Sequence, residues 1–200
     1  MTAAELSALL VLATATSFTP GPNTTLSTAL AANRGLRGAL HFVLAVPVGW
    51  GLLLTLCAGG VGSLVLAWPS LRSAIVLAGV AYLLWLARRL WGSGSLSAAD
   101  AQRLDVSFGQ GVLLQFLNIK AWMLALSVTA GWIAGQPDAL GRYGLALPLM
   151  LFFAFSSNFS YALIGSLLRR WLAQGQRLLY FNRLMALALV GTALWILQSL

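Results

Sequence analysis

Long apolar runs separated by short polar connections divide the 200-residue chain. Each run is long enough for a helix to cross the hydrocarbon core of a bilayer, which takes about 17 to 25 residues. The expected spans are 4–32, 39–66, 71–91, 109–134, 144–168 and 183–199. The pattern predicts an all-α polytopic membrane protein with six transmembrane helices.

The composition supports this prediction and indicates a single transmembrane domain over 1–200. Hydrophobic residues make up 60% of the chain and charged residues 8%, whereas a soluble domain carries roughly 25% charged residues. The polar connection 92–108 is the longest, and it separates a first half at 1–91 from a second half at 109–200. So little charge cannot cover a soluble globule of this size.

The arginines indicate the orientation in the membrane. Nine lie in the first, third and fifth connections, against two in the second and fourth. The nine are Arg34, Arg37, Arg88, Arg89, Arg103, Arg169, Arg170, Arg177 and Arg183, and the two are Arg72 and Arg142. Cytoplasmic connections are rich in arginine and lysine, so both termini and the connections with Arg72 and Arg142 are predicted to be periplasmic. Basic residues dispersed in this way also argue against a nucleic-acid partner.

Three spans on each side of the loop 92–108 predict a 3+3 inverted repeat. An odd number of spans per half makes the second half cross the membrane in the opposite sense to the first. In inverted-repeat transporters, the substrate site lies where corresponding helices of the two halves are interrupted. The first and fourth spans carry such interruptions.

The first interruption is the sequence TPGPN, Thr19 to Asn23. A proline inside a helix costs about 3 kcal/mol, so Pro20 and Pro22, with Gly21 between them, are expected to end the helix. In lipid, the backbone groups that they free must bond to protein or to water in a cavity. A helix restarting at Asn23 would present free N–H groups that suit a carboxylate. The alternative is a structural kink.

The fourth span carries Lys120 about eleven residues from its start, which places the lysine roughly 15 Å into the hydrocarbon. A lysine stem of about 6 Å cannot reach the headgroups from this depth. Lys120 is therefore expected to face protein or water, as a fixed structural cation, as a partner for an anionic substrate group or as a group that titrates during transport. Asn118 lies beside Lys120 in the sequence, and Gln115, three residues before Asn118, is expected to share the helix face of Asn118.

Two further patterns concern helix contacts. Asn158, within SSNFSYALIG of the fifth span, is either a pathway residue or a polar contact that holds helices together. Gly131 and Gly135 form a G-x-x-x-G pair, a pattern of close helix contact or of a homodimer.

Several chemistries are absent from the sequence. The four acids, Glu5, Asp100, Asp105 and Asp138, lie outside the spans or at their edges, so no carboxylate is expected beside a cationic substrate. Cys57 is the single cysteine, which excludes a disulfide or a dithiol relay within the chain. No phosphate loop, metal cluster or cofactor motif is present. His41, expected at the interface without an acid partner, argues against an intramembrane serine hydrolase.

These motifs resemble the LysE/RhtB family of bacterial amino-acid exporters over essentially the whole chain. The resemblance lies in TPGPNTTLSTALAANRGLRGAL (19–40), in LAGVAYLLWLARRLW (77–91) and in LNIKAW, where Ile119 replaces the proline of the family's N-P-K motif. It implies a multi-pass protein of the bacterial inner membrane that exports amino acids by secondary transport coupled to the proton motive force. The pattern looks most similar to the cysteine/O-acetylserine exporters.

The resemblance implies pathway roles for Pro20, Gly21, Pro22, Asn23, Asn118 and Lys120, and the lack of a membrane acid favours a neutral amino acid as the substrate. With the polar neighbours added, the predicted substrate pathway comprises Thr19, Pro20, Gly21, Pro22, Asn23, Gln115, Asn118, Lys120 and Asn158. A passive channel, a structural membrane subunit and an intramembrane enzyme remain alternatives.

Overall fold

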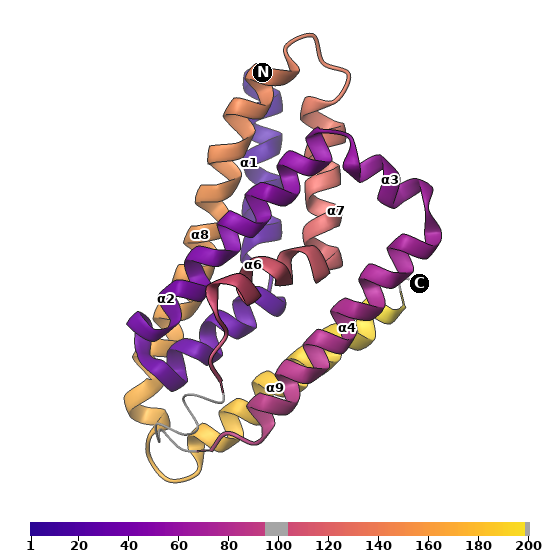
Figure 1. Cartoon of the computed structure of the whole chain (residues 1–200). Helices are drawn as coiled ribbons and strands as arrows, with labels where there is room; N and C mark the ends of the chain where they lie inside the picture. Colours follow the sequence, from indigo (N-terminus) through magenta and orange to yellow (C-terminus); the bar gives the residue numbers. More distant parts are fainter. Residues whose placement is uncertain (95–103, 199–200) are drawn as a thin grey trace.

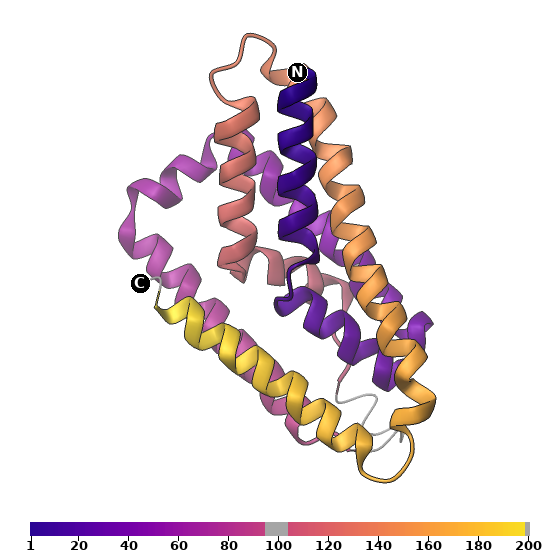
Figure 2. The same cartoon turned by 180° about the vertical axis from the view of Figure 1, so that it is seen from behind.

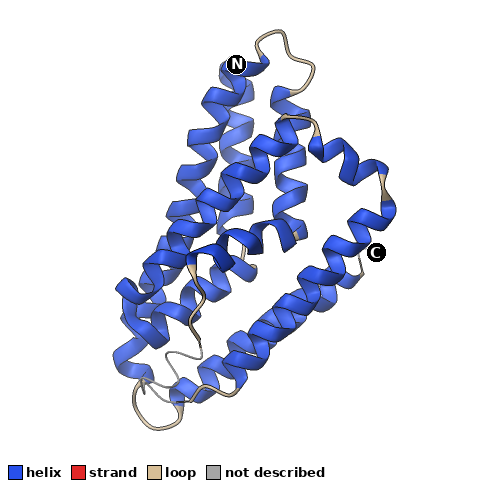
Figure 3. Ribbon diagram, in the orientation of Figure 1, coloured by secondary structure: helices blue, strands red, loops and turns tan. Residues whose placement is uncertain are grey.

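The computed structural model describes residues 1–94 and 104–198, which form helices and turns with no strand among them (Figures 1 and 3). The helices are α1 (Ala3–Phe18), α2 (Pro22–Ala58), α3 (Val61–Ala67), α4 (Pro69–Trp91), α6 (Phe108–Leu117), α7 (Ile119–Val128), the π-helical turn η1 (Thr129–Ile133), α8 (Ala139–Leu172) and α9 (Arg177–Leu197). Most of the predicted loop 92–108, including Asp100 and Arg103, lies outside the described residues.

Four helices are long and apolar enough to cross a membrane: α2, α4, α8 and α9. The pair formed by α6 and by residues 119–133 is bent by 70° and gives a fifth candidate if it is counted as one span. The predicted class, an all-α polytopic membrane protein, is therefore confirmed. The count of six spans and the 3+3 repeat stay predictions.

Gly35 divides α2 into two arms. Its backbone has φ 76° and ψ 170°, a conformation that glycine adopts without strain and that interrupts the helix. The first arm runs from the middle of the molecule away from the N-terminus, and the second arm returns beside it (Figures 1 and 2). The chain thus reverses its direction at a single residue, Gly35, within the predicted first connection, NRGLRG (33–38).

Two predicted boundaries are wrong. The second span was predicted as 39–66, but α2 ends at Ala58 and a separate helix, α3, begins at Val61. The reason is the glycine pair between them, in which Gly60 has φ 94°. The fifth span was expected from residue 144, yet α8 begins at Ala139 because the Asp138 carboxylate accepts a hydrogen bond from the Gly141 N–H at 3.1 Å.

Small residues let the helices approach closely, as expected for helices packed in lipid. A Cβ atom on Gly165 of α8 would lie 2.2 Å from the Thr28 carbonyl oxygen of α2, and one on Gly79 of α4 would lie 2.0 Å from the Leu117 carbonyl oxygen. The two glycines of the G-x-x-x-G pair do not lie in the same helix, because Gly131 is in η1 and Gly135 is in the turn that follows. The homodimer stays a prediction.

Helices α4 and α9 lie side by side and diverge from the other helices towards the C-terminus (Figures 1 and 2). At their other end, two buried amides join α9 to α2. The Asn33 Nδ2 donates to Asn182 Oδ1 at 2.8 Å, and the Asn182 Nδ2 donates back to Asn33 Oδ1 at 2.9 Å. Asn182 also donates to the Ser93 carbonyl oxygen at 2.9 Å, so this junction includes the end of α4.

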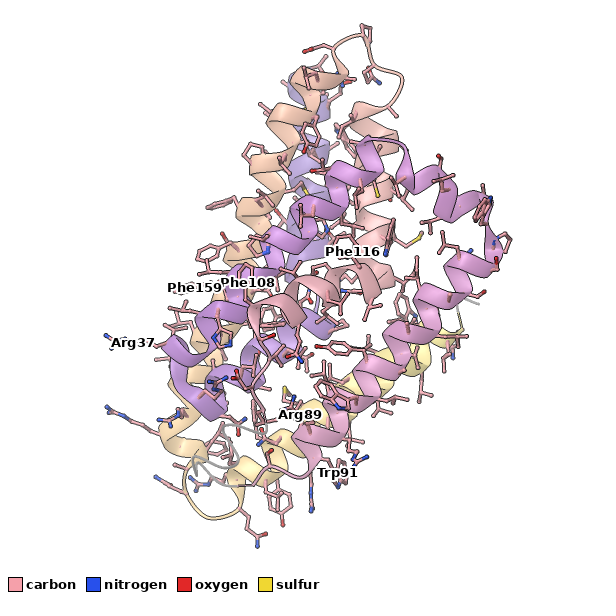
Figure 4. All side chains as sticks on the ribbon, in the orientation of Figure 1. Arg37, Arg89, Trp91, Phe108, Phe116 and Phe159 are labelled. Carbon is pink, nitrogen blue, oxygen red and sulfur yellow. The ribbon has the colours of Figure 1, made fainter. Side chains whose placement is uncertain are left out.

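The arginines are distributed unevenly in space as well as in sequence. Arg37 and Arg89, together with Trp91, lie in the half of the molecule farther from the N-terminus (Figure 4). At the N-terminal end, Arg142 is paired with Glu5 through two hydrogen bonds of 3.0 and 3.3 Å. Which side is cytoplasmic and which is periplasmic stays a prediction.

Replacing Asn182 with alanine tests the amide junction. The substitution leaves the buried Asn33 amide and the Ser93 carbonyl without their partner, so we expect the free energy of unfolding to fall by about 1 to 2 kcal/mol. Unfolding of the purified protein in mixed micelles measures the change. Thr192→Ala on the same helix is the control, because its hydroxyl bonds only to Ala188 in its own helix. Equal stability of the two variants would contradict the assignment.

Candidate functional site

The two predicted interruptions meet in the structure. The first lies between the end of α1 at Phe18 and the start of α2 at Pro22, and the second lies at Asn118, between α6 and α7. The Lys120 ammonium donates a hydrogen bond to the Thr19 carbonyl oxygen at 3.1 Å. Figure 2 shows the break between the indigo α1 and the purple α2 in front of the bent segment. Residues a hundred positions apart thus form one site.

The start of α2 is fixed by its own first turn. Pro22 is the first helical residue, where the missing N–H has no helical partner to lose. The Thr24 hydroxyl accepts a hydrogen bond from the Gly21 N–H at 2.9 Å, and the Thr25 N–H bonds to the Gly21 carbonyl oxygen at 2.9 Å. The backbone N–H groups of Asn23 and Thr24 follow in the first turn, where the positive end of the helix dipole lies.

The carbonyl end of α1 bonds to side chains from the second half. The Tyr161 hydroxyl donates to the Phe18 carbonyl oxygen at 3.0 Å, and Lys120 donates to that of Thr19. An ammonium has three N–H donors, so this bond leaves two of them for other partners. Within residues 1–94 and 104–198, Lys120 forms no ion pair: Asp105 pairs with Arg34 and His41, Glu5 pairs with Arg142, and Asp138 caps α8. Lys120 is therefore a cation without a carboxylate partner in the described protein.

The second interruption forms although Ile119 replaces the proline of the family motif. Asn118 has φ −100° and ψ 101°, outside the helical region, and its side-chain oxygen accepts a hydrogen bond from the Lys120 N–H at 3.2 Å. The asparagine side chain caps α7 and so supplies the break without proline. The Leu117 carbonyl beside it packs against Gly79 of α4.

Gln115 holds Asn23 in place. The Asn23 Nδ2 donates to Gln115 Oε1 at 2.8 Å, and the Gln115 Nε2 donates to Asn23 Oδ1 at 3.1 Å and to the Gly111 carbonyl oxygen at 3.1 Å. Gln115 is fully buried. The predicted common helix face with Asn118 is wrong, because the helix ends between the two residues.

Two cavities adjoin the breaks. The smaller has a volume of about 70 Å³ and is walled by polar groups of α1, α2, α7 and α8, among them Thr16, Ser17, Asn23, Lys120 and Asn158. The larger, about 470 Å³, lies between the breaks and the α9 face that carries Thr192 and Trp195. Thr19, Gly21, Pro22, Asn118 and Lys120 line both cavities, whereas Pro20 lines only the larger. Eight of the nine predicted pathway residues thus line these two cavities, and Gln115, which lines neither, bonds to one of the eight, Asn23.

Asn158 lines the smaller cavity and also joins two helices. Its side-chain oxygen accepts a hydrogen bond from the Ser27 hydroxyl at 2.9 Å, and its Nδ2 donates to the Ala154 carbonyl oxygen at 2.9 Å. Both readings of this residue, pathway contact and helix contact, agree with the geometry.

The sequence did not reveal the apolar wall of the smaller cavity. Val46, Trp50, Leu124 and Met150 form it, and all four lie inside apolar runs, where they resemble core residues. Trp50 carried the one usable signal: it lies in the middle of a span between two glycines, instead of near a span end where tryptophan is common.

His41 has an acid partner, contrary to the sequence-based expectation. Asp105, near the end of the loop 92–108, lies beside α2. Its carboxylate is 3.3 Å from His41 Nε2, which also lies 2.9 Å from the Val106 carbonyl oxygen. His41 lines neither cavity at the breaks. No group of three or more His, Cys, Asp or Glu that could hold a metal occurs within the described parts of the chain.

Comparisons with protein families and with curated proteins both give matches. The family model of LysE type translocators matches residues 14–199, nearly the whole chain. The chain belongs to this family. This LysE type translocator is 32% identical over 196 residues to the cysteine/O-acetylserine efflux protein of Salmonella typhimurium, covering 96% of this chain and 97% of the relative. It is 30% identical over 194 residues to the protein of the same name from Escherichia coli K12, with the same coverage. No solved structure matches it.

A double-mutant cycle tests the amide pair that joins the two breaks of this translocator. Gln115→Ala leaves the half-buried Asn23 amide without its partner, and Asn23→Ala leaves the buried Gln115 amide with only its bond to the Gly111 carbonyl oxygen, whereas the double variant removes both amides. We expect the double variant to lose about 1 kcal/mol less free energy of unfolding than the sum of the single losses.

The control cycle pairs Asn23→Ala with Asn182→Ala, two substitutions at separate hydrogen-bond networks, whose effects should add. Additive losses in the Asn23 and Gln115 cycle would show that these amides do not stabilise each other.

Proposed function

We propose that this protein is a secondary transporter that exports small neutral amino acids or their derivatives, such as cysteine, O-acetylserine, homoserine or threonine, across the bacterial inner membrane. The observation that carries the proposal is the meeting of two broken helices around a polar cavity at which Lys120 has no carboxylate partner. The names of the relatives, cysteine/O-acetylserine efflux proteins, support the same substrate class.

Two helix ends of opposite polarity suit the two charges of an amino acid. The substrate carboxylate would lie between the free donors of the Lys120 ammonium and the first turn of α2, at Asn23 and Thr24. The substrate ammonium would lie at the carbonyl end of α1, where Thr16 and Ser17 line the cavity. No carboxylate of the described residues lines the cavity, so a second positive charge on the substrate would have no partner. This favours neutral over basic amino acids.

Transport by alternating access requires the site to open to each side in turn. The larger cavity separates the breaks from α9 and is the space into which this helix could close. A substrate carboxylate would replace the Thr19 carbonyl as the partner of Lys120, and the loss of that contact would loosen the first break. Coupling to the proton motive force is part of the proposal, with Lys120 as the titratable side chain that faces both cavities.

Neutralising Lys120 tests its role. Lys120→Met keeps the apolar stem and removes the charge, so we expect efflux of labelled cysteine and O-acetylserine from reconstituted vesicles to fall more than tenfold. Arg37→Met, at an exposed position beside the α2 reversal, removes a charge away from the cavities and should transport normally. Wild-type efflux by Lys120→Met would remove this lysine from the mechanism. Unsaturable transport by the wild type, independent of a proton gradient, would indicate a passive channel.

The orientation of the chain is testable with fused reporters. We propose that both termini are periplasmic and that the loop 92–108 is cytoplasmic. The reason is that nine arginines lie in the first, third and fifth connections and only two in the second and fourth. Alkaline phosphatase, which is active only outside the cytoplasm, should be active after Leu200 and inactive within the loop. The reverse pattern would overturn the topology and leave the site geometry unaffected.

A further inference from the structure

Three arginines stack on tryptophan rings where α4 and α8 end and α9 begins. Such cation–π contacts hold a guanidinium in place without using its N–H donors, which remain free for other partners. The three pairs, with the distance from the guanidinium carbon to the centre of the ring, are Arg89 on Trp85 at 4.6 Å, Arg177 on Trp171 at 4.7 Å and Arg183 on Trp91 at 5.3 Å.

Arg183 differs from the other two arginines in its polar contacts. Arg89 donates to the Asp105 carbonyl oxygen at 3.2 Å, and Arg177 donates to Gln174 Oε1 at 2.6 Å. Arg183 is half-buried, and within residues 1–94 and 104–198 its Nε atom is buried without a hydrogen-bond partner. A buried donor without a partner is unfavourable, so we expect a group from outside the chain to bind here.

The chemistry of this arginine selects an anion. Each acidic residue in the described parts of the chain bonds to another group: Glu5 to Arg142, Asp105 to Arg34, and Asp138 to the start of α8. A guanidinium offers five N–H donors in a planar fork, which matches the oxygens of a carboxylate or a phosphate. The arginine on Trp91 therefore has donors for an anion and no carboxylate of the described protein to receive them.

The amide junction between α2, α4 and α9 holds the stack of Arg183 on Trp91 in place. Arg183 follows Asn182 in α9, and Trp91 ends α4 two residues before Ser93, whose carbonyl oxygen accepts the hydrogen bond from Asn182 at 2.9 Å. Asn182 is fully buried, whereas Trp91 is 47% exposed. The junction thus fixes the two helix ends inside the protein, and Trp91 lies at the surface next to it (Figure 4).

Exposed apolar side chains continue from the stack along both helices. Leu84 and Leu77 lie seven and fourteen residues before the tryptophan in α4, and Leu187 and Leu194 lie four and eleven residues after the arginine in α9. These intervals place each leucine on the same helix face as the stacked residue of its own helix. All four leucines are exposed. A phospholipid has the same order of groups, a charged headgroup followed by acyl chains.

The position favours the phosphate of a membrane lipid over a free anion. Tryptophan rings gather at the level of the lipid headgroups, and Trp91 lies at the end of a helix long enough to cross the membrane. Basic sites between transmembrane helices bind the headgroups of anionic phospholipids. A free anion would make no use of the leucines beside the stack.

We propose that Arg183 and Trp91 form a binding site for one anionic phospholipid, with its phosphate on the Arg183 guanidinium and its acyl chains along the exposed leucines of α4 and α9. The bound lipid joins the ends of these helices from outside, as the Asn182 amide joins them from inside. Neither residue lines a cavity at the breaks, so this site is separate from the proposed substrate site and does not depend on transport.

Native mass spectrometry of the full-length protein tests the site. The protein is released from micelles that contain equal amounts of phosphatidylglycerol, which is anionic, and phosphatidylcholine, whose phosphate is balanced by its own cation. We expect one bound phosphatidylglycerol, in about fivefold or greater excess over phosphatidylcholine. Arg183→Gln removes the charge and should lower this ratio about fivefold. Trp91→Ala removes the ring that holds the guanidinium and should lower it as well.

Arg37→Gln is the matched control. It removes the same charge from an exposed arginine that lies far from Trp91 in the same half of the molecule (Figure 4), so the lipid ratio should stay unchanged. The ratio is read within one spectrum and is independent of the amount of folded protein.

Three results would overturn the site. Equal losses in Arg37→Gln and Arg183→Gln would indicate a general attraction of anionic lipid to basic residues. An unchanged ratio in Arg183→Gln would remove this arginine from lipid binding. Displacement of the bound lipid by inorganic phosphate at equal concentration would show that the ligand is a free anion. If Arg183→Gln does not fold, Trp91→Ala, at an exposed position, decides the matter by the same ratio.

Discussion

The structure depends on which groups form hydrogen bonds with the free backbone N–H and C=O groups where two helices stop inside the membrane-spanning part of the chain. Lipid offers no hydrogen bonds, so every carbonyl freed by Pro20 and Pro22 needs a partner within the molecule. Lys120 and Tyr161 supply these partners, and Asn118 caps the second break with its own side chain. The same requirement that makes a broken helix costly therefore draws polar and charged side chains to one place. A site for a charged small molecule arises from that convergence.

The packing around this site follows from the small size of a few residues. Gly165, Gly79 and Gly49 bring α8, α4 and α6 to within backbone contact of their neighbours, which no larger residue would allow. Hydrophobic burial drives helices together weakly in lipid, so such contacts and hydrogen-bonded amide pairs carry the association. Asn23 with Gln115 and Asn33 with Asn182 are two such pairs, each linking segments from different halves of the chain.

The sequence predicted the membrane class and the first interruption, and it marked the fourth span by Lys120, because prolines and a buried lysine are costly in a membrane helix and therefore conspicuous. Eight of the nine residues that it predicted for the pathway line the two cavities. It did not predict the apolar wall, since Trp50 and Met150 resemble any core residue until their neighbours are known. The role of Gln115 was also hidden: its partner Asn23 is 92 residues away, and the break that separates Gln115 from Asn118 depends on a cap that only the fold reveals. Gly35 and Gly60 were ordinary glycines in the sequence, and their positive φ angles moved the helix boundaries.

The contact between Lys120 and Thr19 has a consequence for biogenesis. Thr19 leaves the ribosome 101 residues before Lys120 does, and 142 residues before Tyr161, which bonds to its neighbour Phe18. Until the second half is made, the carbonyl end of α1 has none of these partners, and a bare break of this kind is poorly suited to lipid. The carbonyl end of α1 therefore gains its side-chain partners only after the second half has been made, and until then water or the insertion machinery would have to satisfy it.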